Sequence, residues 1–441
     1  MGGEEKGPED IGAQLSALPP GTHVKILRRG SREWEGWLLP RDPYAPPESL
    51  RLKLASGYNV GLLIREVERF EKLPGVLGGD FSAVPRSDNS TRDTSIPKGS
   101  IALLTTGGTI ASSIDYATGG VKPVRGTAAL DALFPEGAKD IMMREVFDVL
   151  SEDIGPTHWE GLAEAVHETF LEGARGIVIS HGTDTLAHTA SALSFQLRNL
   201  PGPVVLVGAQ RSIDRPSSDG IQNMHWAVRV AREAELGEVV VVMHAGPSDD
   251  VGAIHRGTRV RKMHSTRRDA FRTLNGVRLG VVDDSGVHLN STHRPRSSAG
   301  IVLEKGFDTR GRLVWITPGL GAATAESFCQ GARGVIVAAT GMGHMPSELV
   351  PWVRGLTEQG VFVGITTQCL EGEVDPYVYS RGRELMSAGA VYLEDLAPET
   401  AYVKLLWVLG RTQGTRGIRE QMLEDMAGEM GDRRPLKGGT S

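Results

Sequence analysis

Cysteine and long apolar runs are both scarce in this sequence. Only two cysteines, Cys329 and Cys369, occur in 441 residues, too few for the disulfide framework of a small secreted domain. No run approaches the roughly 18 apolar residues of a membrane-spanning helix, and the polar start, Met1 to Lys6, lacks the apolar core of a signal peptide. We therefore expect a protein of the reducing cytoplasm that is neither exported nor bound to a membrane.

An excess of positive charge is also missing, as are the common metal and nucleotide motifs. The formal net charge is -6, which argues against a molecule built as an electrostatic sheath for nucleic acid. The sequence contains no Cys/His cluster with zinc spacing, no His-Glu-x-x-His and no P-loop ending in Gly-Lys-Ser/Thr. We expect no catalytic metal and no cofactor in this chain.

The first part of the chain has short alternating apolar runs separated by turn residues. This pattern predicts a small all-β barrel over residues 19–76. Its strands are expected at residues 24–27, 35–39, 50–54 and 61–64. The polar residues 1–18 are interpreted as a flexible arm and residues 77–98 as a linker.

Continuous apolar runs alternate with helical patterns from residue 99 onward. The runs lie at residues 101–104, 176–179, 203–207 and 239–243. Such runs are typical of strands covered on both faces, and residues 157–171 have the spacing of an amphipathic helix. We predict an α/β domain with a parallel sheet over residues 99–300 and a second α/β domain over 301–426, followed by a polar tail, 427–441.

Two polar segments follow apolar runs. Residues 105–112 read Thr-Thr-Gly-Gly-Thr-Ile-Ala-Ser, and residues 180–185 read Ser-His-Gly-Thr-Asp-Thr. Ligands of α/β sheets bind beyond the carboxyl ends of the strands, where both segments are expected. The glycines of the first segment let backbone N–H groups face a ligand beside the Thr109 hydroxyl. By itself, this segment is equally well interpreted as a tight turn or a phosphate cradle.

The second segment offers another hydroxyl, that of Thr183, although Thr183 or Asp184 is equally well interpreted as a helix cap. A threonine is a poor nucleophile unless a neighbour takes its proton, which a lysine beside a carboxylate can do. Lys262 is the candidate lysine, but it lies in a basic run, residues 256–264, of a kind that is usually a solvated face. His181 is assigned no catalytic role. The first hypothesis is amide hydrolysis.

Together these motifs resemble the bacterial-type L-asparaginase and glutaminase family. The matching stretches are Thr-Gly-Gly-Thr-Ile-Ala at 106–111, Ser-Glu-Asp at 151–153, His-Gly-Thr-Asp-Thr at 181–185, Val-Gly-Ala at 207–209, and Lys262 followed by Asp-Ala-Phe at 269–271. The resemblance extends over residues 99–425. It implies a two-domain, asparaginase-like body with parallel sheets.

The resemblance also implies roles for eight residues. The catalytic residues would be Thr109, Thr183, Asp184 and Lys262. The substrate-binding or lid residues would be Tyr116, Ser151, Glu152 and Ala209. Thr109 would be the primary nucleophile and Thr183 the second, with an acyl-threonine intermediate that water hydrolyses. Which threonine attacks first is left open by the sequence.

The N-terminal segment and residues 366–375 and 378–383 resemble the glutaminase subunits of archaeal tRNA-dependent amidotransferases. The resemblance implies that the chain hydrolyses glutamine and passes ammonia to a separate E-type subunit, which uses ATP and Mg to convert Glu-tRNA(Gln) to Gln-tRNA(Gln). It implies self-association as a homodimer or a tetramer, a heterotetrameric complex with the partner, and tRNA(Gln) bound mainly through that partner. It also implies low activity for the isolated chain, and a pocket completed by residues 341–344 of a neighbouring copy.

Two other functions compete with this one. A free-standing cytoplasmic L-asparaginase would hydrolyse asparagine without a partner. A non-catalytic scaffold would bind an amino acid as a signal, but it would not need Thr109, Thr183, Asp184 and Lys262 together. The arginines at 28, 29 and 32 are either an RNA contact or an exposed charged turn, of which the second is favoured.

Overall fold

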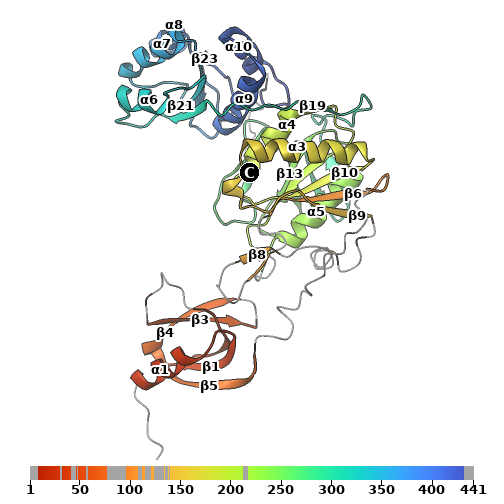
Figure 1. Ribbon diagram of the computed structural model, residues 1–441, viewed down its shortest axis with the longest axis vertical. Coiled ribbons are helices and arrows are strands. Elements are labelled where there is room, and N and C mark those ends of the chain that lie inside the picture. The colour runs from red at the N-terminus through yellow and green to blue at the C-terminus, as the bar shows by residue number, and fades with distance from the viewer. Residues whose placement is uncertain are drawn as a thin grey trace, which may run out of the picture. The chain divides into compact units, whose positions relative to one another are not determined.

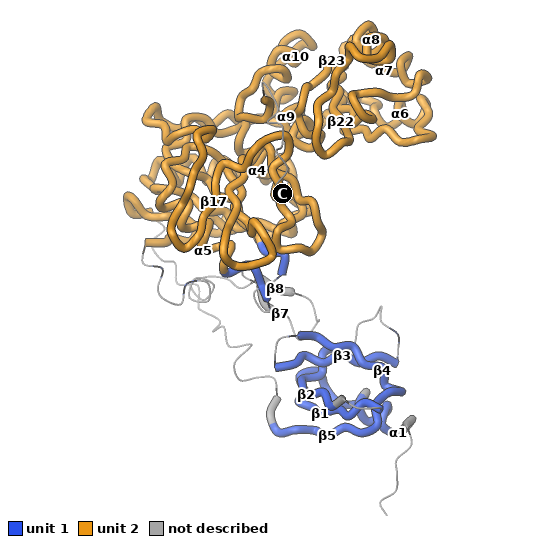
Figure 2. The backbone as a smooth tube through the Cα atoms, turned by 180° about the vertical axis from the view of Figure 1, so that it is seen from behind, with its two compact units in different colours: residues 1–93, 109–139, 209–221 blue, residues 94–108, 140–208, 222–441 orange. Residues whose placement is uncertain are grey.

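The computed structural model divides the chain into two compact units (Figure 2). Unit 1 contains residues 1–93, 109–139 and 209–221, and unit 2 contains residues 94–108, 140–208 and 222–441. The structure describes residues 8–29, 32–40, 46, 48–55, 58–76, 96–107, 112–114, 121–123, 134, 138, 140–211 and 217–431.

Unit 1 contains a five-stranded antiparallel sheet in the order β4-β3-β2-β1-β5. Its strands are β1 (Thr22–Arg28), β2 (Arg32–Leu38), β3 (Ser49–Leu54), β4 (Asn59–Leu63) and β5 (Val67–Val76), with the turn η1 (Ile64–Glu66) before β5. The four predicted strands are confirmed. β5 escaped prediction because charged residues fill most of its first half, although Phe70 pairs with Ile26 of β1. Between described residues β4 and β5 do not pair, so the barrel is open there.

The predicted flexible arm is wrong for residues 8–17. These residues form the helix α1 (Pro8–Ala17), in which Ile11 and Leu15 are buried in the same core cluster as Val24 and Leu52. The two apolar side chains stand four residues apart, so they share one face of the helix. Unit 1 also contains a short hairpin of β7 (Ser112–Ile114) and β8 (Val121–Pro123).

An eight-stranded sheet forms the centre of unit 2, in the order β18-β17-β14-β13-β12-β10-β6-β9. Its strands are β6 (Ile101–Thr105), β9 (Ile141–Glu145), β10 (Gly176–Ser180), β12 (Val204–Val207), β13 (Val239–His244), β14 (Gly252–Arg256), β17 (Gly280–Asp283) and β18 (Gly286–Leu289). The strands from β9 to β13 are parallel, as predicted. The last three are antiparallel, because connections such as residues 245–251 are too short for a crossover.

Helices cover both faces of this sheet. They are α3 (Pro156–Leu171), α4 (Leu186–Gln196) and α5 (Gly220–Glu233). Figure 1 shows α3 and α4 along one face and α5 along the other. Coverage on both sides explains the continuous apolar strands, since β10, β12 and β13 are buried along their whole length. Short pieces complete this part: η2 (Ser151–Asp153), β11 (Leu197–Arg198) paired with β19 (Val302–Leu303), and the hairpin of β15 (Val260–Lys262) and β16 (Phe271–Thr273).

A second, parallel sheet of four strands follows in the order β20-β21-β22-β23. Its elements are β20 (Gly311–Trp315), α6 (Ala322–Phe328), β21 (Gly334–Ala339), η3 (Ser347–Leu349), α7 (Val350–Glu358), β22 (Phe362–Thr367), α8 (Ser380–Ser387), β23 (Val391–Tyr392), α9 (Pro398–Arg411) and α10 (Thr415–Leu423). Helix α9 packs against α4, where the rings of Trp407 and Phe195 stack with centroids 6.1 Å apart. The two α/β domains therefore share a core.

The predicted polar tail is wrong for residues 427–431. Ala427, Glu429 and Met430 are buried, and the Glu429 carboxylate lies 2.7 Å from Nζ of Lys404 in α9. Its oxygens also accept the backbone N–H groups of Met426 and Ala427. The polar composition of residues 427–431 does not indicate this burial, because a glutamate is buried only where a counter-charge and hydrogen-bond donors surround it. Residues 432–441 lie outside the described part of the chain.

Replacing Glu429 with glutamine should lower the free energy of unfolding by about 3–5 kcal/mol, because it leaves the fully buried Lys404 ammonium without its carboxylate. Urea unfolding followed by tryptophan fluorescence measures the loss. Glu420→Gln is the matched control, since the pair of Glu420 with Arg416 is largely exposed, and it should change the value by less than about 0.5 kcal/mol. Equal effects of the two variants would contradict the structural role of the buried pair.

Candidate active site

The register of three parallel strands places the two polar segments side by side. Ser180 at the end of β10 pairs with Thr105 of β6 and with Val207 of β12. Beyond these pairs, the Thr106 hydroxyl donates to the Ser180 carbonyl at 2.9 Å, and the His181 N–H donates to the Val207 carbonyl at 2.9 Å. Both segments therefore leave the same edge of the sheet, which is where α/β proteins bind ligands.

Lys262 reaches the second segment from a distant part of the sequence. Its Nζ donates to Thr183 Oγ1 and to Asp184 Oδ1, both at 2.8 Å. The Lys262 side chain is 14% exposed, whereas that of Asp184 is 70% exposed, so the amine is largely enclosed while its carboxylate partner faces solvent. The structure thus brings together three of the four predicted catalytic residues.

This arrangement suits proton transfer from a hydroxyl. A lysine in the amine form can take the Thr183 proton across the short Oγ1–Nζ contact, and the neighbouring carboxylate of Asp184 stabilises the ammonium that forms. The oxygen left behind is a nucleophile able to attack an amide carbon.

Two glycines make room for this cluster. A Cβ atom on Gly208 would lie 2.6 Å from Cγ2 of Thr183, and one on Gly182 would lie 2.7 Å from Cβ of Ser151. Both distances are too short for a side chain at position 208 or 182. In addition, the Thr185 hydroxyl donates to the Ser151 carbonyl at 2.5 Å. Predicted substrate residue Ser151 is therefore buried against the second segment, and its neighbour Glu152 is exposed.

Thr109 and Tyr116 lie outside the described residues. Ala209 is buried, follows β12 by two residues and belongs to unit 1. Gly107, at the start of the first segment, has a φ of +92°, and a Cβ there would lie 2.5 Å from the Val149 carbonyl oxygen. The first segment thus needs glycine where it leaves β6.

His181 is enclosed among hydrogen-bonding groups. Its Nδ1 lies 2.6 Å from the Gly182 carbonyl and its Nε2 lies 2.8 Å from the Thr189 hydroxyl, which also accepts the Trp159 indole N–H at 3.1 Å. Burial lowers the pKa of His181 to about 4. A neutral ring that donates at Nδ1 and accepts at Nε2 satisfies every partner, which agrees with the structural role expected for it.

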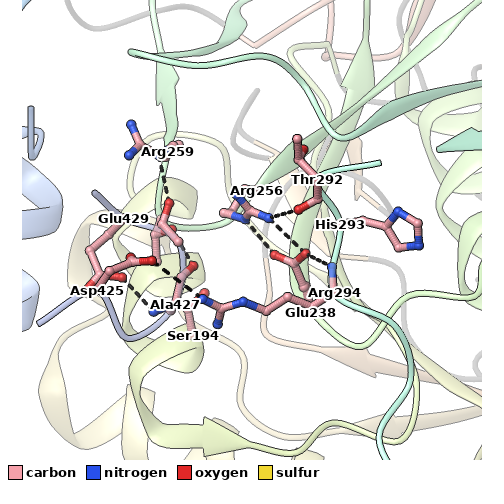
Figure 3. A network of polar contacts seen from close by, with 12 residues as sticks. Ser194, Glu238, Arg256, Arg259, Thr292, His293, Arg294, Asp425, Ala427 and Glu429 are labelled. Carbon is pink, nitrogen blue, oxygen red and sulfur yellow. Dashed lines mark hydrogen bonds and ion pairs between the residues drawn. The ribbon is translucent and has the colours of Figure 1, made fainter. Parts of the chain in front are cut away.

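The basic run before Lys262 is not a solvated face. Arg256 bonds to Glu238 at 2.7 Å, Arg259 to Asp395 at 3.0 Å and Arg261 to Glu399 at 2.9 Å. Figure 3 shows Arg256 directed at Glu238 and Thr292. Sequence reasoning missed these pairs, although the spacing of two between Arg259 and Arg261 is the signal of a strand with one charged face.

Family models match most of the chain. The asparaginase N-terminal model matches residues 100–295, the glutaminase/asparaginase C-terminal domain matches residues 312–422, and the GatD N-terminal domain matches residues 18–73. Among curated proteins, the chain is 40% identical to the GatD subunit of the glutamyl-tRNA(Gln) amidotransferase from Pyrococcus horikoshii, over 93% of this chain and 94% of the relative. The chain belongs to the GatD family. A relative of the same name from Saccharolobus islandicus is 41% identical, over 93% of this chain and 92% of its own length.

The solved structures that share this fold include L-asparaginases. The thermostable enzyme from Thermococcus kodakarensis matches with a TM-score of 0.69 and 33% identity, over 76% of this chain and 100% of its own. L-asparaginase I from Vibrio cholerae matches with a TM-score of 0.67 and 27% identity, over 76% and 99%. The predicted asparaginase-like α/β body is therefore confirmed. The matches extend over almost the whole length of these asparaginases, whereas about a quarter of this GatD family member lies outside them.

Two further observations concern only the described residues. No group of three or more His, Cys, Asp or Glu side chains among them is arranged to hold a metal ion. None of their helices is both long and apolar enough to cross a membrane.

Thr183→Val should lower the hydrolysis of an amino-acid amide at least about 10²-fold while the fold is retained, because it removes the hydroxyl at Lys262 and nearly preserves volume. Ammonia release and circular dichroism measure the two effects. Thr169→Val, at a fully buried threonine on α3, is the matched control and should keep activity. Full activity of Thr183→Val would exclude Thr183 from the mechanism.

His181 should make the protein less stable in mild acid. Its pKa is about 4 when folded and 6.5 when exposed, so the unfolded chain binds the extra proton and stability falls as the pH drops below 6.5. The contribution is about 2 kcal/mol between pH 6.5 and pH 5. His181→Asn should flatten the pH dependence of urea unfolding. Identical slopes for His181→Asn and the wild type would contradict a buried neutral ring.

Proposed function

We propose that this chain is the glutaminase subunit of a tRNA-dependent amidotransferase. The observation that carries the proposal is the likeness to the GatD subunits along 93% of the chain, which includes an N-terminal domain at residues 18–73. The contact of Lys262 with Thr183 and Asp184 supplies the chemistry.

Glutamine is cleaved through an acyl-threonine intermediate in this proposal. One threonine hydroxyl attacks the side-chain amide carbon, with Thr109 taken as the primary nucleophile and Thr183 as the second, and the hydroxyl proton passes to a base. At Thr183 that base is Nζ of Lys262, which then protonates the leaving ammonia. Water attacks the ester carbon and gives a proton to the same base, which returns it to the departing threonine oxygen as glutamate is released. Asp184 stabilises the ammonium state of Lys262 in each half-reaction.

The substrate residues hold the α-carbon end of glutamine. Ser151 is buried beside Gly182, and the exposed carboxylate of Glu152 suits an α-amino group. Tyr116 closes over the substrate, and the backbone of Ala209 polarises the amide. The domains at residues 19–76 and 99–300, and a second α/β domain that starts at residue 301, accompany this assignment and are supported by the matched family ranges.

The ammonia passes to an E-type subunit, which uses ATP and Mg to amidate Glu-tRNA(Gln). This chain needs no cofactor for hydrolysis. Its net charge of -6 suits a subunit that leaves most tRNA(Gln) contact to its partner. The assembly is a homodimer of this chain with E-type partners, and its two cysteines suit a reducing cytoplasm.

A free-standing L-asparaginase is the second candidate. It is favoured by the match to the Thermococcus kodakarensis enzyme at 33% identity. That match covers 76% of this chain, so it gives no role to the N-terminal domain.

The test is ammonia release from glutamine and from asparagine, with and without a co-expressed E-type subunit, ATP, Mg and glutamylated tRNA(Gln). We expect glutamine turnover to rise about fivefold or more with the complete set, since coupling between sites is commonly of that size. Omitting only the charged tRNA is the control. Fast asparagine turnover that ignores the partner would replace the proposal with the asparaginase function.

A further inference from the structure

Lys262 stands on a very short strand. β15 has three residues and, among the described strands, pairs only with β16, so this hairpin belongs to none of the three larger sheets. Side chains alternate along a strand, which puts Val260 and Lys262 on one face and Arg259 and Arg261 on the other. The position of Nζ at Thr183 therefore depends on what holds the arginine face.

Arg259 fixes the base of the hairpin. Its Nε donates to the Gly428 carbonyl at 2.7 Å, and its Nη1 donates to the Asn275 carbonyl and to Asp395 Oδ2, both at 3.0 Å. The Arg259 and Asp395 side chains are 8% and 4% exposed. Figure 3 shows Arg259 beside the chain segment that contains Ala427 and Glu429. The second α/β domain and the C-terminal segment thus anchor this hairpin.

Arg261 is the second anchor and the one next to Lys262. Its Nη2 lies 2.9 Å from Oε1 of Glu399, with side chains 24% and 21% exposed. Glu399 lies in the first turn of α9. A partly buried ion pair of this kind is directional and is less screened than a surface pair.

The same turn of α9 also touches the other half of the cluster. The Thr400 hydroxyl donates to the Thr258 carbonyl at 2.9 Å, just before β15, and lies 3.4 Å from the Ser191 hydroxyl on α4. Helix α4 begins directly after the Thr183–Thr185 segment. One turn of α9 therefore contacts both the helix that follows Thr183 and the strand that carries Lys262.

We propose that Glu399 is a positioning residue that holds Lys262 against Thr183 through Arg261. The inference rests on the proposed hydrolytic function of Thr183 and Lys262. Its physical basis is that proton transfer needs a heavy-atom separation near 3 Å, and a displacement of about 1 Å can cost up to about 10²-fold in rate. The second α/β domain would then set the geometry of chemistry performed by the first.

Glu399→Gln in the full complex tests this inference. We expect kcat to fall about tenfold with KM unchanged, because the proton-transfer geometry is altered and the substrate contacts are not. Glu172→Gln is the matched control, since Glu172 pairs with Arg144 at 2.8 Å with side chains 35% and 25% exposed. It should lose similar stability and keep kcat. Equal kcat in Glu399→Gln and Glu172→Gln would overturn the proposal.

The double variant Arg261→Gln/Glu399→Gln separates positioning from stability. It leaves no unpaired charge, so we expect the free energy of unfolding to recover toward the wild type. The low kcat should persist, because the link from α9 to the Lys262 strand is still missing. Recovery of kcat together with stability would reduce the pair to a structural role.

A readout independent of activity completes the test. The rate at which an amine-acylating reagent labels Lys262, measured by peptide mass spectrometry, should rise about threefold or more in Glu399→Gln and remain unchanged in Glu172→Gln, because a released Nζ loses hydrogen bonds. If the wild-type complex hydrolysed neither glutamine nor asparagine, the proposed function would fail. The labelling rate of Lys262 would still decide whether Glu399 positions that residue. Unchanged labelling together with unchanged kcat would leave Glu399 without this role.

Discussion

The register between β6, β10 and β12 is the constraint on which the site depends. Because Ser180 pairs with both Thr105 and Val207, the three strands end at the same level. The segments that follow these strands therefore start at the same edge of the sheet. Parallel pairing makes this possible, because it points all carboxyl ends the same way. A slip by one residue would turn every side chain of a strand to the opposite face and remove the buried apolar contacts of helices α3 and α4.

The sheet alone does not assemble the chemistry, since Lys262 comes from a hairpin outside it. That hairpin is held through charges, with Arg259 and Arg261 directed at Asp395 and Glu399 of the second α/β domain. Burying an arginine is costly unless a carboxylate and further acceptors meet it. Because Arg259 and Arg261 need these hydrogen-bond acceptors, the hairpin is held in one position.

Apolar packing between α4 and α9 gives these ion pairs a rigid base. The stacked rings of Phe195 and Trp407 lie in that contact, and the first turn of α9 emerges from it toward β15. The C-terminal segment adds the Lys404–Glu429 pair and the Gly428 carbonyl that Arg259 reaches. Residues from the last part of the chain thus contact a hairpin in the middle of it, and the two α/β domains share one hydrophobic core.

The sequence by itself determined the elements with strong local signals. Buried strands such as 176–180 are continuous apolar runs, and the Trp159 face of α3 has helical spacing. Local propensity and periodicity suffice there. Only the tertiary structure decided that α1 covers the N-terminal sheet, that residues 427–431 are buried, and that Arg259 and Arg261 face Asp395 and Glu399 rather than water. The physical reason is that a charged residue carries no local sign of burial, because its cost is offset by partners that lie elsewhere in the chain, such as Asp395, 136 positions after Arg259.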